Sequence, residues 1–82
     1  MKIDYLSYQQ QMDIIKDLYN ITDGIEALAR LEKEYGIDIN RLGLKPTLND
    51  FARKLDKTKF LNWEIEEAIK RHSGHEIKLN EL

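Results

Sequence analysis

Residues 46–72, PTLNDFARKLDKTKFLNWEIEEAIKRH, carry two apolar stripes at helical spacing. The first stripe ends at Leu55 and the second begins at Leu61. At about 100° per residue, the six steps between them leave the stripes about 120° apart, so one straight helix could not bury both on one face. The stretch therefore predicts two helices joined by a turn at residues 56–59. This outline fits a helix-turn-helix and equally an ordinary helical hairpin.

Start and stop signals divide the rest of the chain. Ser7 and Asp23 are each followed three residues later by Gln or Glu, the spacing of a helix start, and apolar residues then recur every three or four positions. Gly36 and Gly74 can end helices in the left-handed conformation. The sequence thus predicts an all-α fold, a compact four-helix domain over residues 1–82 with helices at about 8–19, 24–35, 48–55 and 59–73.

Two segments lie outside these helices. Residues 37–46 are too apolar for a free linker, so we expect an anchored connection that packs over the helices. The tail 75–82 alternates Ile77 and Leu79 with polar residues. We expect a frayed end there, with a short strand paired to the amino terminus and a segment ordered by a partner as the alternatives.

The four helices should share one core, because a domain of this size needs most of its apolar residues simply to fold. We expect the core to contain Met12, Ile15, Leu18, Tyr19, Ile25, Leu28, Leu31, Tyr35, Leu48, Phe51, Leu55, Leu61, Ile65 and Ile69.

Composition narrows the class of protein. The chain has 82 residues, a net charge of −2 and no cysteine, so disulfides and thiolate metal sites are excluded. The amino terminus has no long apolar run, so we expect neither a secretory signal nor a membrane span, and we place the protein in the cytoplasm. Abundant Ile, Lys, Asn and Tyr with no Val is typical of an AT-rich genome and favours a small bacterial or bacteriophage regulator.

Catalytic equipment is scarce. Ser7 and Ser73 are the only serines, and neither lies in a glycine-rich elbow. His72 and His75 form a lone H-x-x-H pair without the further ligands that a stable metal site needs. We therefore expect no enzyme activity, no metal and no cofactor.

One function that the sequence raises is DNA binding. Residues 39–59 hold six basic and two acidic side chains, and the order of residues from Leu48 to Asn62 resembles a helix-turn-helix. In that interpretation residues 57–59 would contact phosphates and Asn62 would reach a base edge. The departures are Asp56, where a turn glycine is usual, and three glutamates just beyond Asn62, which would repel phosphates.

Binding to a protein is the interpretation that we prefer. Trp63 lies on a different face of its helix from Leu61 and Ile65, and it follows closely on Phe60, so at least one of these aromatics should reach the surface as an interface anchor. The alternative is that both cap the bundle under the 37–46 connection. A further alternative is that two copies of the chain form a homodimer by pairing this same surface of the fourth helix. The partner-binding candidates are Arg53, Lys54, Lys57, Thr58, Lys59, Phe60, Asn62 and Trp63.

Overall fold

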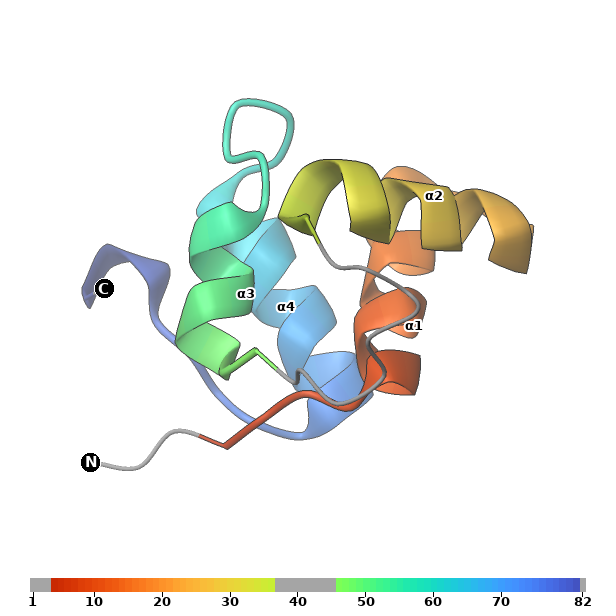
Figure 1. Cartoon of the computed structure of the whole chain (residues 1–82). Helices are drawn as coiled ribbons and strands as arrows, with labels where there is room; N and C mark the ends of the chain where they lie inside the picture. The colour runs from red at the N-terminus through yellow and green to blue at the C-terminus, as the bar shows by residue number, and fades with distance from the viewer. Residues whose placement is uncertain (1–3, 37–45, 82) are drawn as a thin grey trace.

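The computed structural model describes residues 4–36 and 46–81, and the regular elements of this part of the chain are all helices (Figure 1). The elements are α1 (Tyr8–Tyr19), α2 (Gly24–Tyr35), α3 (Leu48–Lys54), α4 (Asn62–Ser73) and a short 3₁₀ helix, η1 (Leu79–Glu81). The predicted all-α, four-helix fold is confirmed. The predicted anchored connection over 37–46 lies, apart from Pro46, outside the described residues.

The first three helices begin at the side chains that cap them. Ser7 Oγ accepts the Gln10 N–H at 3.1 Å while Gln10 Oε1 accepts the Ser7 N–H at 2.9 Å, a complete capping box. Asp23 accepts the N–H of Ile25, and Thr47 accepts the N–H of Asp50. These local bonds explain why α1 and α2 have the predicted bounds.

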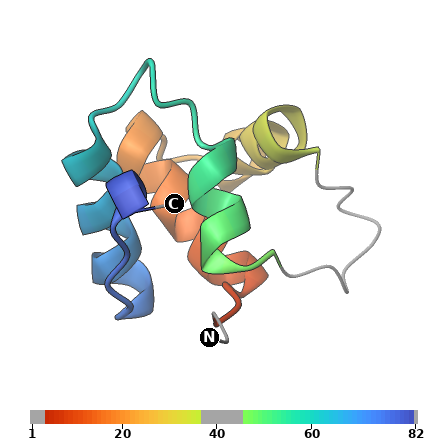
Figure 2. The same ribbon diagram turned by 90° about the vertical axis from the view of Figure 1, so that its left-hand side faces the viewer.

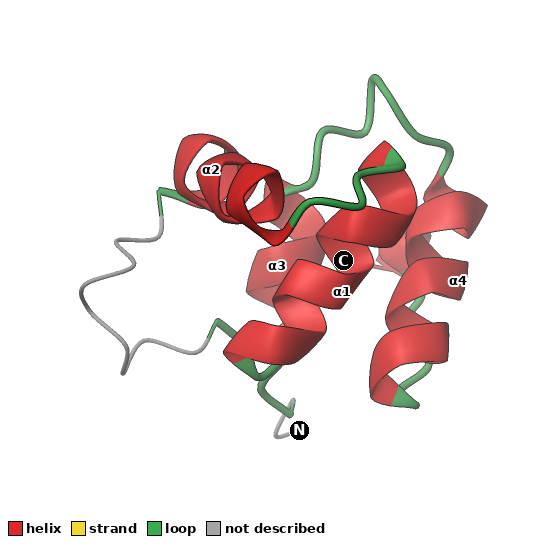
Figure 3. Ribbon diagram, turned by 90° about the vertical axis from the view of Figure 1, so that its right-hand side faces the viewer, coloured by secondary structure: helices red, strands yellow, loops and turns green. Residues whose placement is uncertain are grey.

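α1 occupies the centre of the arrangement. It packs against both α2 and α4, and α2 crosses one of its ends (Figures 1 and 3). α3 and α4 run in opposite directions and are joined by a loop at the end of the molecule where α3 finishes (Figure 2). An isolated antiparallel bridge between Tyr5 and Thr47 holds the amino-terminal segment beside the start of α3.

The core follows the predicted stripes with two exceptions. Ile25 and Leu61 were expected inside and are exposed, with 76% and 62% of their surface accessible. Ile25 lies two positions, or about 200°, from the buried Ala27 on α2 and so points outward. Met12, Leu18, Tyr19 and Leu28 are half-buried. The other eight predicted residues are buried, together with Leu6, Ile14, Ile21, Ala27, Ala52, Ala68 and Leu79.

The fourth helix begins three residues later than the predicted residue 59. Asp56 Oδ1 accepts the Thr58 N–H at 3.0 Å, and the Asp56 carbonyl accepts the Lys59 N–H at 3.1 Å. These bonds close a turn that is not helical, and Leu61 follows in extended backbone with ψ of 150°. α4 therefore starts at Asn62, and Leu61 precedes the helix.

The described part of the tail, residues 75–81, corrects the expected frayed end. Leu79 is only 3% exposed, and its N–H donates to Glu66 Oε2 of α4 at 2.9 Å. His75 Nε2 lies 3.3 Å from Asp4 Oδ2, so the tail also touches the amino-terminal segment. Residues 75–81 form no strand pairing with the described part of the amino-terminal segment, which was one alternative for the tail. The tail returns along α4 because Leu79 completes the core there.

We expect Leu79→Ala to lower the free energy of unfolding by about 2–3 kcal/mol, since it removes a buried side chain from the core. Chemical denaturation followed by circular dichroism measures the change. Ile25→Ala is the matched control, because Ile25 is exposed, and should alter stability by no more than about 0.5 kcal/mol. Equal effects of the two substitutions would show that the tail does not pack as described.

Candidate functional site

Two large apolar side chains are exposed side by side at the start of α4. Leu61 is 62% and Trp63 is 61% exposed, although most apolar residues in the described part of the chain are buried or half-buried. They border a shallow hollow that we call the Trp63 surface. It is lined by Lys57, Phe60, Leu61, Asn62, Trp63, Glu66, Lys78 and Asn80. The hollow thus combines residues of the α3–α4 loop, α4 and the tail.

Helical geometry explains why Trp63 faces outward. Ile65 and Ile69 point into the core from α4, and Trp63 lies two positions, or about 200°, before Ile65. Leu61 is fixed just ahead of the helix, because its N–H donates to Glu64 Oε2 at 2.8 Å. The two exposed side chains are therefore presented by ordered backbone.

Phe60 lies partly under this surface and connects it to the core. Its ring meets the ring of Tyr19 edge to face, with centroids 4.9 Å apart and an interplanar angle of 89°. The guanidinium of Arg30 lies 4.9 Å from the centroid of the same tyrosine ring. Of the two aromatics considered from the sequence, Phe60 is half-buried against α1 and Trp63 is exposed.

Lys59 lies near the same tyrosine, with its Nζ 5.9 Å from the centroid of the Tyr19 ring. Burial, reinforced by the carboxylate of Glu34, raises the pKa of Tyr19 to about 12, so its hydroxyl stays neutral. Lys59 Nζ lies 3.9 Å from Glu34 and 3.7 Å from Asp56. Lys59 is therefore engaged with its own chain and is less available to a partner than the sequence indicated.

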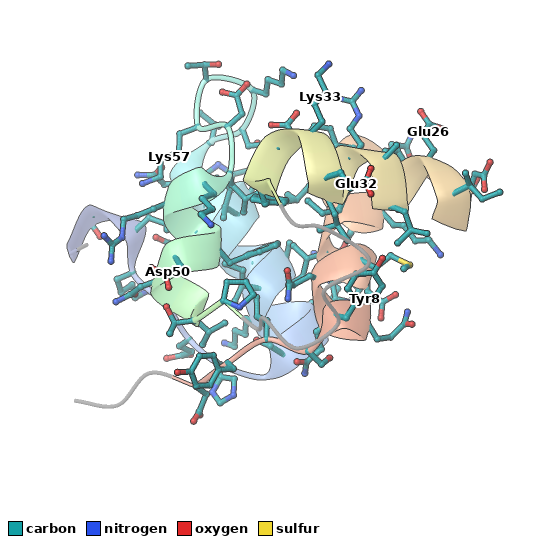
Figure 4. All side chains as sticks on the ribbon, viewed as in Figure 1. Tyr8, Glu26, Glu32, Lys33, Asp50 and Lys57 are labelled. Carbon is teal, nitrogen blue, oxygen red and sulfur yellow. The ribbon has the colours of Figure 1, made fainter. Side chains whose placement is uncertain are left out.

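The remaining basic candidates are more accessible. Arg53 lies 4.0 Å from Asp50, at the limit of an ion pair, and both side chains are half exposed or more. Lys54 and Lys57 are exposed, and within the described residues neither has a carboxylate within 4.0 Å. Lys57 projects at the α3–α4 side of the molecule (Figure 4). Thr58 is exposed but its hydroxyl donates to Asp56.

The connection between α3 and α4 differs from that of a helix-turn-helix. Residues 55–61 separate the two helices, whereas the motif joins its helices by a turn of about three or four residues. α3 and α4 also run in opposite directions (Figure 2). Glu64, Glu66 and Glu67 follow Asn62 on the second helix. The helix-turn-helix interpretation remains unconfirmed.

A second hollow, which Trp63 also lines, contains a carboxylate of α1 that is hydrogen-bonded to residues of α4. Asp17 of α1 accepts hydrogen bonds from Arg71 and from His72, whose Nε2 lies 2.9 Å away. Burial opposes ionisation of Asp17, but the bonds from His72 and Arg71 outweigh it, so the pKa of Asp17 is lowered. This cluster joins α1 to the end of α4 and was not predicted, because no local pattern relates residues so far apart in sequence.

The two histidines serve separate contacts. His72 meets Asp17 and His75 meets Asp4, so they do not converge on one site. Within residues 4–36 and 46–81 no three His, Asp or Glu side chains gather in a metal-binding arrangement. None of the helices in these ranges has the length and apolar character needed to cross a membrane.

Comparison with known proteins identifies no relative: no family model, curated protein or solved structure matches this chain.

We expect Asp17→Asn to lower the free energy of unfolding at neutral pH by less than about 1 kcal/mol, because the carboxylate is one-third exposed. The lowered pKa means that the wild-type contribution is complete above the ordinary value of 3.8 and is lost as the pH falls through the lowered pKa. The two proteins should therefore converge in urea denaturation at low pH.

Glu67→Gln serves as the control for this prediction. Glu67 makes the same change from carboxylate to amide on α4, and within the described residues it has no ion pair. It should leave stability nearly unchanged at neutral pH. A deficit of Asp17→Asn that stays constant down to the acid limit would contradict the ionic origin of the effect.

Proposed function

We propose that this chain is a small non-catalytic binding protein that acts by occupying the surface of a protein partner, as a regulator, inhibitor or assembly factor. The observation that carries the proposal is the paired exposure of Leu61 and Trp63. Tyr5 and Ile25 are also exposed, but neither lines this hollow, whereas Leu61 and Trp63 line it together. Exposed apolar residues that are clustered in this way are typical of interaction sites. The cysteine-free composition fits the reducing cytoplasm, and the AT-rich residue balance fits a bacterial or bacteriophage source.

The surroundings of the pair favour binding. Trp63 offers a large contact area with only two rotatable side-chain bonds, and tryptophan is enriched among the residues that dominate interface energies. Because Glu64 fixes the Leu61 backbone and Tyr19 fixes Phe60, little order has to be gained when a partner docks. Neither exposed side chain is needed to fill the core, so their exposure is not explained by folding.

DNA is the alternative partner, and the contacts of Lys59 weaken it. A helix-turn-helix would need this cation to meet phosphates, whereas Lys59 already lies near Glu34 and Asp56. The two partners also differ in their response to salt. Affinity for DNA must fall steeply with salt in proportion to the phosphates contacted, while an interface anchored by Leu61 and Trp63 should lose much less.

We expect the double substitution Leu61→Ser with Trp63→Ser to weaken partner binding by at least about tenfold, since both anchors are removed. The measurement is affinity capture from a lysate of the source organism, with the partner identified by mass spectrometry and its affinity then determined with purified protein. Circular dichroism should show unchanged helical content, because both side chains are exposed.

Ile25→Ser is the matched control, because it removes an equally exposed apolar side chain from α2. It should leave binding intact. Capture of the same partner by the double variant at undiminished affinity would exclude the Trp63 surface. Salt-sensitive amide shifts at residues 53–62 on titration with a mixed-sequence DNA duplex would instead support the DNA alternative.

A further inference from the structure

Two lysines border the Trp63 surface. Lys57 comes from the α3–α4 loop and Lys78 from the tail, and both line the hollow beside Leu61 and Trp63. Among the described side chains neither ammonium has a carboxylate within 4.0 Å. The pKa of Glu76 is lowered mainly by Lys70 and further by the charge of Lys78, so Lys57 is the freer of the two cations. The fold thus brings together two cations that are 21 positions apart in the sequence.

One carboxylate of the described residues borders the same hollow, and it is already engaged. Glu66 Oε2 accepts the N–H of Leu79 at 2.9 Å, which fixes that side chain toward the tail. The hollow therefore carries two positive groups against one negative group, and it has an apolar centre in Leu61 and Trp63.

The charge differs between the hollows that Trp63 lines. A second one is lined by Asp17, Glu64 and Glu67, with Arg71 as its one basic residue. A third one contains Lys70 and Lys78 together with Glu66, Glu67 and Glu76. Arg71 is bound to Asp17, so the acidic character of the second hollow remains. A partner segment lying over Trp63 would meet attraction for anions on the Lys57 side and repulsion on the Glu67 side.

We infer that the partner segment covering the Trp63 surface is acidic and carries apolar side chains, so that its carboxylates lie near Lys57 and Lys78 and its apolar groups cover Leu61 and Trp63. This inference rests on the function proposed above and names the chemistry of the partner. Charge complementarity of this kind steers association and fixes orientation.

The apolar centre distinguishes this occupant from a nucleic acid. Leu61 has no flat face on which a base could stack, and Trp63 is the one exposed large aromatic among the residues lining the hollow. A phosphate backbone would leave both side chains in water. A peptide with leucine or phenylalanine next to aspartate or glutamate satisfies both the apolar and the charged part of the surface.

The test uses a library of random 16-residue peptides displayed on phage and selected against the intact protein. The selected sequences should be enriched in Asp and Glu together with Leu or Phe. Trp63 is the only tryptophan of the chain, so a selected peptide lacking tryptophan can be titrated by intrinsic fluorescence. Covering Trp63 should shift its emission to shorter wavelength.

Three single charge reversals then separate the contributions. Lys57→Glu and Lys78→Glu should each weaken the selected peptide by at least about fivefold, and the loss should shrink at high salt. Lys33→Glu changes the net charge equally, but Lys33 projects from α2 (Figure 4) and does not line this surface, so it should have little effect. All three side chains are exposed, so the fold should be retained.

The outcomes distinguish this inference from the proposed function. The selected peptides could need Leu61 and Trp63 but be neutral or basic, or they could bind both lysine variants normally. Either result would overturn the inference of an acidic partner, while the proposed protein-binding surface would still be supported. Absence of any peptide that depends on Leu61 and Trp63 would overturn the inference as well. Quenching of Trp63 fluorescence by a single-stranded oligothymidylate, without enrichment of any peptide, would overturn the inference and indicate that the occupant is a nucleic acid.

Discussion

The turn closed by Asp56 determines where the second half of the molecule lies. Its side chain accepts from the N–H and hydroxyl of Thr58, and these bonds lower the pKa of Asp56. The turn separates the apolar phases of α3 and α4, so Phe51 and Ile65 can both enter one core from helices that run in opposite directions. Without this break, a continuous helix would leave one of the two stripes in water.

The same turn produces the exposed pair on which the proposed function rests. Because α4 begins at Asn62, Leu61 lies outside the helix and Trp63 falls on the face opposite Ile65. An earlier start for α4 would have made Leu61 part of the buried stripe, as the apolar pattern predicted. The position of the helix start therefore decides between a core leucine and a surface leucine, and local hydrogen bonds of Asp56 and Glu64 fix it.

Features that depend on interactions between neighbouring residues could be predicted from the sequence, and features that depend on long-range contacts could not. The bounds of α1 and α2 were predicted correctly, because Ser7, Asp23 and Gly36 act on neighbouring backbone. The predicted start of α4 at about residue 59 was wrong, because Asp56 accepts the Thr58 N–H and closes a turn there, and the helix begins only at Asn62. Among the candidate site residues, the sequence predicted that at least one of Phe60 and Trp63 reaches the surface, but not which one, and in the structure it is Trp63. The engagement of Lys59 was not predictable, because it depends on Glu34 in a distant helix.

The tail was the least predictable segment because its position depends entirely on long-range contacts. Leu79 is buried and Glu66 holds its N–H, while Lys78 and Asn80 on either side of it line the Trp63 surface. An alternating pattern at a chain end reads locally as a frayed or strand-like segment. In the folded protein Leu79 is buried in the core, and its neighbours Lys78 and Asn80 line the candidate site. The stability of the fold and the composition of the surface are thus linked through Leu79, since releasing this side chain would also remove Lys78 from the hollow.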